Sequence, residues 1–410
     1  MYDGTFCRED ETREASDVGK TRYNRRVMAK QSLGVGIVGY GFIGRVHAWA
    51  HRSLPFFYSP LPRETRLIGV CTARPETAEA ARREAGFEFA TTDPAELLAR
   101  PDIDILHCCT PNDSHADLLL AALCAGKQVY CDKPLTRTLA EARTVAEAAR
   151  NASVIHRMTF HYRFAPATLR AKELVESGFL GDLYHFRAAY LHAGYIDPNR
   201  PRTWRTVMEK SGGGAIMDLG VHVFDLARFL VGEFDAVNAQ LVTRIPSRPD
   251  VVTGQPAPVD VDDIAVVQAR TRSGAVGVIE ASRLATGVQD ELRIELHGSK
   301  GMIAWNLMDP NYLDVYDARD PEEPLGGNRG VKRIECVSRY PKPWSFKTPK
   351  NTLGWNQLHA HSLFDFVRAV AENDTATGPT FADGFAAQAF VHACQESAAG
   401  GGVWTAVPAT

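Results

Sequence analysis

The chain has 410 residues and a formal net charge of −3; hydrophobic residues make up 45% of it and charged residues 23%. This near-neutral balance excludes a strongly basic nucleic-acid-binding protein. The sequence contains no run of about 18 apolar residues, so no membrane span is predicted. The length is typical of two domains. The eight cysteines include no CxxC pair. We therefore expect free thiols in a reducing cytoplasm, no metal site, and neither nucleic acid nor membrane as a partner.

The first segment, residues 1–32, is polar and charged without periodicity, and it is predicted to be a disordered extension. Arg25-Arg26 precedes an apolar run, as in a twin-arginine export signal. That run, however, is the strand and glycine loop described next, which an exported enzyme does not discard. We interpret the extension as a non-signal segment.

A glycine loop follows the first apolar strand. Leu33–Val38 predicts the strand, and a helix is expected to run to about His51. Between a strand and a helix, the GxGxxG spacing is typical of a dinucleotide-binding turn: the first glycine makes the turn, the second admits the pyrophosphate, and the third allows close packing. The predicted cofactor-binding residues of the loop are Gly39, Gly41, Phe42, Ile43 and Gly44.

The second predicted strand, Arg66–Cys71, follows a Pro- and aromatic-rich insert over Ser53–Arg63. It ends in Thr72-Ala73-Arg74, with no acid to bind a free ribose 2′-hydroxyl. We predict NAD or NADP as cofactor, with Thr72 and Arg74 slightly favouring NADP. Alternatively, Arg74 is a solvated residue at a helix start.

Two further loops follow strands predicted over Ile103–Cys109 and Gln128–Cys131. Since loops after parallel strands line the ligand crevice, their polar residues are candidates for cofactor contact, although helix capping alone explains an asparagine there. A lysine followed by proline at this edge is poorly explained as surface charge. The candidates are Thr110, Pro111, Asn112, His115, Asp132 and Lys133.

The stretch Ser211–Asp225 contains three consecutive glycines and then a helical pattern. Asp218 and His222 are one turn apart on the same stripe of that helix. A carboxylate one turn before a histidine suits a proton-handling pair. The alternative is an ordinary amphipathic helix with an ion-paired histidine.

Four motifs together resemble those of the Gfo/Idh/MocA family (glucose–fructose oxidoreductase, inositol dehydrogenase, rhizopine catabolism), from about residue 33 to the C-terminus. They are Gly39-x-Gly41-x-x-Gly44, Thr110-Pro111-Asn112-x-x-His115, Asp132-Lys133-Pro134 and Gly213-Gly214-x-x-x-Asp218-x-x-x-His222. Within the family, the insert and the segments Tyr190–Tyr195 and Phe381–Gly384 are similar to levoglucosan and glycoside dehydrogenases. Two positions depart from the pattern: Asp132 replaces the usual Glu, and His161 replaces an Asn often found before Tyr-Arg.

The resemblance implies an α/β protein with two domains. Residues 33–152 are expected to form a Rossmann domain with a doubly wound parallel sheet. Residues 153–410 are expected to form an α+β domain with a large, mostly antiparallel, open-faced sheet that binds substrate and supports a homodimer or homotetramer. We expect the strand at Val154–Phe160 to open this second domain, a long loop over Asp317–Asn351, and closing helices over Gln357–Glu372 and Asp383–Ala398.

The resemblance also implies hydride transfer between a nicotinamide cofactor and a secondary hydroxyl of a sugar, anhydrosugar, glycoside or inositol-type polyol. His222 would act as base, Asp218 would orient it or bind the hydroxyl, and Lys133 would polarise the oxygen. Further candidates for sugar contact, each with a structural alternative, are Arg163, His192, Tyr195, Trp204 and Arg205. Two other functions stay open: an NAD-dependent glycosidase that oxidises transiently, and a non-catalytic nucleotide-bound sensor, which would not need the retained lysine and histidine.

Overall fold

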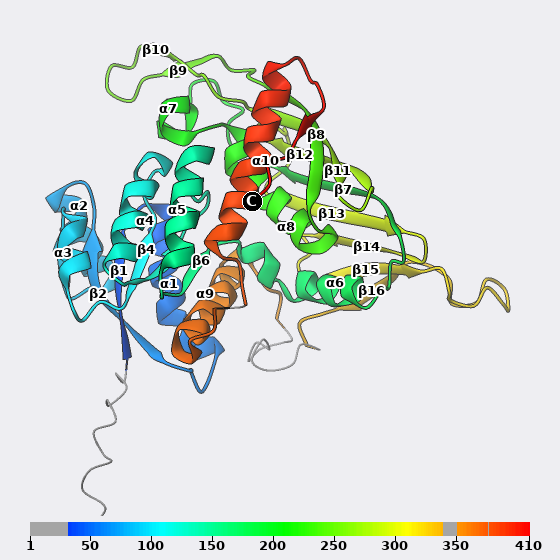
Figure 1. The fold of residues 1–410 in the computed structure, drawn as a ribbon, viewed down its shortest axis with the longest axis horizontal. Helices are drawn as coiled ribbons and strands as arrows, with labels where there is room; N and C mark the ends of the chain where they lie inside the picture. Colours follow the sequence, from blue (N-terminus) through cyan, green and yellow to red (C-terminus); the bar gives the residue numbers. More distant parts are fainter. Residues whose placement is uncertain (1–31, 339–350, 376) are drawn as a thin grey trace, which may run out of the picture.

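The computed structural model describes residues 32–338, 351–375 and 377–410, so the predicted extension falls almost wholly outside the described residues (Figure 1). Two halves lie side by side, with helix α10 (Phe381–Ala399) packed between them. None of the helices in the described ranges is long and apolar enough to cross a membrane.

The N-terminal half contains a six-stranded parallel sheet in the order β3-β2-β1-β4-β5-β6, as the Rossmann prediction requires. Its strands are β1 (Ser32–Val38), β2 (Glu64–Cys71), β3 (Phe89–Thr91), β4 (Ile105–Cys108), β5 (Gln128–Cys131) and β6 (His156–Met158). Its connecting helices are α1 (Phe42–Phe57), α2 (Pro75–Ala85), α3 (Pro94–Ala99), η1 (Asn112–Ser114), α4 (His115–Cys124) and α5 (Leu139–Asn151). Local signals set the helix starts: Asp93 caps α3, and Thr138 forms a capping box with Glu141 at α5.

Three details of this half differ from the prediction. Helix α1 runs on to Phe57, into the expected insert, and contains Pro55 in its last turn. Strand β6, expected to open the second domain, pairs with β5 in the parallel sheet. Helix α9 (Trp355–Glu372), far along the chain, packs against α1 and shares the apolar core beneath it. An apolar run predicts a strand or a helix but not the partner against which it packs.

The C-terminal half contains a nine-stranded sheet in the order β16-β15-β14-β13-β7-β12-β11-β8-β17, in which only the β7–β12 pair is parallel. The strands are β7 (Leu183–Leu191), β8 (Phe234–Val242), β11 (Ile264–Thr271), β12 (Val276–Ser282), β13 (Glu291–Gly298), β14 (Gly301–Asn306), β15 (Tyr312–Asp317), β16 (Lys332–Glu335) and β17 (Thr405–Ala406). The helical segments are η2 (His161–Phe164), α6 (Pro166–Glu176), η3 (Trp204–Thr206), α7 (Met208–Ser211), the π-helical turn η4 (Ile216–Gly220) and α8 (Val221–Val231). This architecture confirms the predicted mostly antiparallel sheet.

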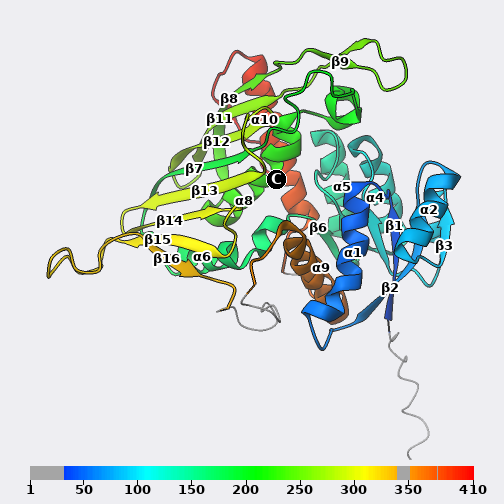
Figure 2. The same ribbon diagram turned by 180° about the vertical axis from the view of Figure 1, so that it is seen from behind.

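Helices α6, α8 and α10 cover one face of this sheet (Figure 1), whereas Figure 2 shows the other face open among the described residues. Burial alternates along β11, as expected for a half-covered sheet. Several strands of this half were not predicted. They are β15, β17, the ribbon of β9 (Ser247–Pro249) and β10 (Pro256–Pro258), and β16, which lies inside the expected long loop. Part of that loop, residues 339–350, lies outside the described residues.

Candidate active site

The loop between β1 and α1 is shaped for a phosphate group. Gly39 has a φ of +88°, and a Cβ there would lie 2.4 Å from the Cys109 carbonyl oxygen. A Cβ on Gly44 would lie 2.2 Å from the Gly39 oxygen, whereas one on Gly41 would meet no atom within 4 Å. Gly41 precedes α1 without a side-chain capping bond. The helix N-terminus therefore faces open space with its amides available to an anion, and these residues fit a dinucleotide pyrophosphate.

Two cavities meet at this loop and share Gly39, Gly41, Thr110 and Pro111 in their walls. The larger, of about 680 Å³, runs from the loop past the end of β2 to α3 and α4. Thr72 and Asp93 line it, but the Arg74 side chain does not; Arg74 instead pairs with Glu76 at 3.3 Å. The two cavities thus adjoin at the glycine loop, and Thr72 stands in the wall of the larger one.

The smaller cavity, of about 260 Å³, lies between the two halves of the protein. The predicted residues Phe42, Ile43 and Asn112 line it, and so do Asp132, Lys133, Trp204, Arg205 and Asp218. One residue that the sequence analysis missed, Arg283, also lines it. Residues that are up to 244 positions apart in the sequence, Gly39 and Arg283, thus line the same cavity.

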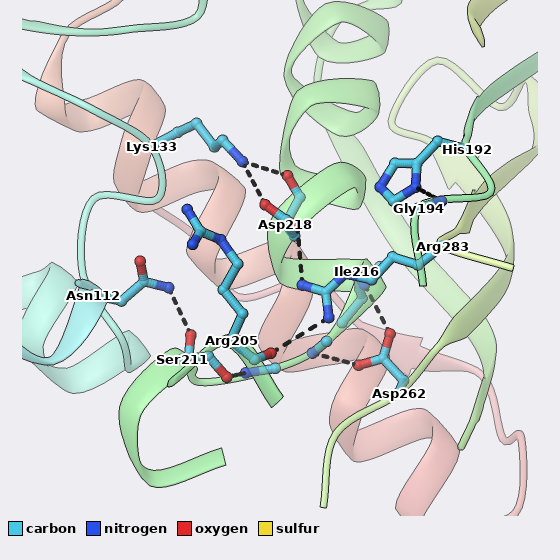
Figure 3. A network of polar contacts seen from close by, with 12 residues as sticks. Asn112, Lys133, His192, Gly194, Arg205, Ser211, Ile216, Asp218, Asp262 and Arg283 are labelled. Atoms are coloured by element: carbon cyan, nitrogen blue, oxygen red, sulfur yellow. Dashed lines mark hydrogen bonds and ion pairs between the residues drawn. The ribbon is translucent and has the colours of Figure 1, made fainter. Parts of the chain in front are cut away.

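Lys133, Asp218 and Arg283 form the polar centre of this cavity (Figure 3). The Lys133 Nζ donates to Asp218 Oδ1 at 2.9 Å and to the Asp218 carbonyl oxygen at 2.6 Å. Arg283, with a relative exposure of 1%, donates to Asp218 Oδ2 at 3.0 Å. Burial alone would raise the pKa of Asp218, but Lys133 and Arg283 outweigh it and hold that pKa well below its usual range. Asp218 is therefore an ionised carboxylate between two cations.

The glycine loop before Asp218 is fixed by its close approach to another segment. The Asp262 carboxylate accepts hydrogen bonds from the Gly214 and Ile216 amides at 2.7 and 2.8 Å (Figure 3). A Cβ on Gly214 would lie 1.7 Å from the Asp262 carbonyl oxygen, so only glycine fits there. Asn112 joins the two halves by donating to the Ser211 carbonyl oxygen at 2.8 Å.

His222 lies in α8 directly after the π-helical turn, and its side chain is nearly buried. Both Asp218 carboxylate oxygens accept from cations, and among the described residues no hydrogen bond joins Asp218 to His222. Burial and, secondly, the charge of Lys133 lower the pKa of His222 well below its ordinary value, although Asp218 opposes this. His222 is therefore neutral at pH 7 and able to accept a proton.

His115 lines neither cavity; it contacts the backbone of the two loops that follow β4 and β5. Its Nδ1 lies 3.0 Å from the Pro134 carbonyl oxygen and its Nε2 lies 3.0 Å from the Thr110 carbonyl oxygen. The sulfur atoms of Cys108 and Cys131 lie within 4.8 Å of its ring, a grouping of metal-ligand type that was not predicted. Because both ring nitrogens face carbonyl oxygens, they act as donors and leave no lone pair for a metal.

The predicted sugar contacts divide into two groups. Trp204 and Arg205 line the smaller cavity. His192 is not among the residues that line it; its Nδ1 accepts from the Gly194 amide at 2.9 Å (Figure 3). Tyr195 is buried, with the Arg283 guanidinium 4.8 Å from its ring centre.

The structure does not place Arg163 at a sugar site, as had been predicted, but in a buried ion-pair network. It is buried, donates to both Asp225 carboxylate oxygens, and donates to Asp383 at 2.9 Å. It joins η2, α8 and α10 as an ion-pair bridge, and it is not among the residues that line the two cavities. A buried arginine requires such partners, and sequence alone does not distinguish it from a sugar-binding one.

The chain was compared with known protein families, curated proteins and solved structures. Residues 33–160 match the oxidoreductase family with an NAD-binding Rossmann fold, and residues 168–304 match the GFO/IDH/MocA C-terminal domain. Levoglucosan dehydrogenase of Pseudarthrobacter phenanthrenivorans is 36% identical over 382 residues, covering 90% of this chain and 97% of that protein. Inositol 2-dehydrogenase of Rhizobium meliloti is 29% identical over 365 residues, covering 89% and 96%.

A solved structure of levoglucosan dehydrogenase in complex with NADH and L-sorbose has a TM-score of 0.87 and 37% identity, covering 93% of this chain and 100% of that one. The structural similarity therefore extends over both halves of the fold. On these matches, the chain belongs to the Gfo/Idh/MocA family of NAD-binding oxidoreductases.

Proposed function

We propose that this protein is an NAD(P)-dependent dehydrogenase that oxidises a secondary hydroxyl of a sugar, anhydrosugar or related polyol. The proposal rests mainly on one observation: the Lys133–Asp218 ion pair lines the smaller cavity, which lies between the two halves and adjoins the glycine loop. The similarity to levoglucosan and inositol dehydrogenases supports this substrate class.

A bound nicotinamide nucleotide supplies the hydride acceptor. The protein must hold the hydroxyl, remove its proton and stabilise negative charge on its oxygen. Lys133 is the donor placed to stabilise that charge, since its Nζ already satisfies an anionic oxygen at the same wall. Asp218, ionised by its two cations, fixes the direction of the Lys133 ammonium. His222, neutral because it is buried, takes the hydroxyl proton.

Both cofactors are proposed to bind, because no acid stands in Thr72-Ala73-Arg74 to select the free 2′-hydroxyl. Arg74, on breaking its exposed pair with Glu76, is the cation available to a 2′-phosphate. An Arg74→Ala variant should raise the KM for NADP⁺ and leave that for NAD⁺ unchanged. Equal changes in the KM values for NADP⁺ and NAD⁺ would show that Arg74 does not bind the 2′-phosphate.

A homo-oligomer is proposed through the open sheet face, where Val266, Val276 and Val278 are exposed. Light scattering should give a dimer or tetramer for the wild type and smaller species for Val278→Glu. A wild-type monomer would contradict this. The seven free cysteines in the described ranges support a reducing, cytoplasmic setting.

The experiment that tests the function follows the absorbance of reduced nicotinamide with NAD⁺ and NADP⁺ separately, across anhydrosugars, inositols, aldoses and glycosides. We expect sustained reduction with at least one of them. Sugar release from a glycoside without net reduction would indicate a glycosidase instead. Sugar binding without any turnover would indicate a sensor.

A further inference from the structure

The catalytic base of the proposed function has little direct access to solvent. The rings of Phe160, His161, Tyr162 and Tyr190 lie between 5.0 and 6.4 Å from the His222 ring, centre to centre, and the residue is 6% exposed. Yet a base that takes one proton in each turnover must release it before the next. The His222 Nδ1 atom is buried and has no hydrogen-bond partner among the described residues, so it is free to pass a proton toward the protein interior.

In the N-terminal half, three buried histidines form a hydrogen-bonded chain. The Nδ1 atoms of His47 and His107 are 3.0 Å apart, and the Nε2 atoms of His107 and His51 are 2.9 Å apart. His51 Nδ1 then lies 3.0 Å from the hydroxyl of Thr65, which is half-buried at the start of β2. The start of β2 is the edge opposite the cofactor loops, so this chain leads away from the cavities. The Cys109 thiol, 3.2 Å from His47 Nδ1, also touches the chain.

Two further histidines join this chain to His222. His161 meets the His222 ring edge-on, with ring centres 5.3 Å apart, and stacks on His359 at 3.8 Å. The His359 ring centre is 6.1 Å from that of His47. Helix α9 supplies His359 and packs against α1, which carries His47 and His51 (Figure 1). Six imidazoles therefore form one row from α8 to the start of β2.

The ring nitrogens along the inner part of the row are buried and unpaired among the described residues. They are His222 Nδ1, both nitrogens of His161, both nitrogens of His359, and His47 Nε2. Buried polar atoms in proteins are normally paired with protein or with ordered water. Six such atoms in one contiguous region favour water molecules that bridge ring to ring.

We infer that the row His222–His161–His359–His47–His107–His51 is a proton relay that carries the substrate hydroxyl proton from the active site to solvent beside Thr65. This inference rests on the proposed dehydrogenase function. The balance is one proton: His222 gains the hydroxyl proton, each ring accepts a proton on one nitrogen and gives one up from the other, and His51 releases one proton at the surface. The two electrons leave the substrate separately, with the hydride.

The protonation states of the row suit this task. Burial lowers the pKa of His47 and His51 to about 3, and it lowers those of His107, His161 and His359 well below the ordinary value. At pH 7 each ring is neutral and has one donor and one acceptor nitrogen, as a relay requires. A purely structural core at these positions would be better filled by apolar rings, because buried polar atoms without a hydrogen-bond partner are destabilising.

The test compares three variants of the full-length protein: His51→Gln at the surface end, His359→Gln in the middle, and His361→Gln as control. Glutamine keeps a donor and an acceptor, so it preserves hydrogen bonds but does not relay protons. His361 is a matched control since it is buried in the same helix, two residues from His359, with its ring against Tyr58 and Phe164. Rapid mixing with an indicator dye measures proton release, and absorbance measures cofactor reduction in the first turnover.

In the wild type and in His361→Gln, proton release should keep pace with turnover. In His51→Gln, cofactor reduction in the first turnover should be unchanged, while proton release slows by about tenfold or more and the solvent deuterium isotope effect on kcat rises. Unchanged proton release in both relay variants would overturn the relay. Failure of the wild type to reduce cofactor would instead count against the proposed function.

A second readout tests the relay without turnover. ¹⁵N NMR of the histidine rings reports which nitrogen carries the proton in the protein free of substrate. If the six rings form one coupled chain, His51→Gln should shift the ring signals of His359 and His161, which it does not contact. Shifts confined to His107 would overturn the relay.

Discussion

Replacing Lys133 by methionine should abolish most of the chemistry while leaving the fold intact. The Lys133 ammonium donates to Asp218 at 2.9 Å, and it is the donor assigned to the developing negative charge. Loss of one such donor in an enzyme active site costs about 10²–10³-fold in kcat, or about 3–4 kcal/mol. The folded state should tolerate the change, because Arg283 still pairs with Asp218 at 3.0 Å and no buried charge is stranded. The loss of stability should thus stay well below the ~3–5 kcal/mol of a broken buried pair.

The assay for Lys133→Met is steady-state turnover together with a cofactor titration and a thermal unfolding curve. We expect kcat to fall by the stated factor while the cofactor Kd changes only a few-fold, since the phosphate-binding loop is untouched. Lys133→Arg, which keeps a positive charge, serves as the comparison. Normal turnover by Lys133→Met, or a loss explained by unfolding, would refute the assignment.

Three other substitutions or conditions test separate parts of the structure. Arg163→Met should lower the free energy of unfolding by about 3–5 kcal/mol in a denaturant titration, because it strands the buried Asp225, whereas Asp383 keeps its pair with Arg228 at 2.7 Å; a loss below about 1 kcal/mol would show that the Arg163–Asp225 pair contributes little to stability. Gly41→Val should weaken cofactor binding at least about tenfold in a fluorescence titration, since its side chain would point into the space meant for phosphate, while thermal stability stays unchanged because no atom lies in its way. The pH profile of kcat/KM should keep its full value as the pH falls from 7 to 6, because burial lowers the pKa of His222 and the neutral base persists; a half-maximal point at or above pH 6.5 would contradict this environment.

Sequence motifs predicted the Rossmann half and the loops that line its cavities. These motifs are local: a glycine needed for close approach, or a proline after a lysine, is visible within a few residues. The mostly antiparallel second sheet was also expected. The order of its strands depends on pairings between distant segments.

The missed features depend on contacts between distant parts of the chain. Arg283 follows β12 without any motif, and the packing of η4 against β12 brings it beside Asp218. Arg163 was expected at the sugar, but Asp225 and Asp383, 62 and 220 residues away, bind its guanidinium. Helix α9 returns to the N-terminal half, which no local signal indicates. The row of histidines has the same origin, since its members come from α1, β4, η2, α8 and α9.

The most direct test of the central claim is the stoichiometry of the reaction with the best substrate from the screen. Reduced nicotinamide and sugar product are to be quantified together over many turnovers. The dehydrogenase account predicts one reduced nicotinamide released for each oxidised sugar. Sugar conversion that continues without net reduction of the nicotinamide would contradict it and would favour transient oxidation by a glycosidase.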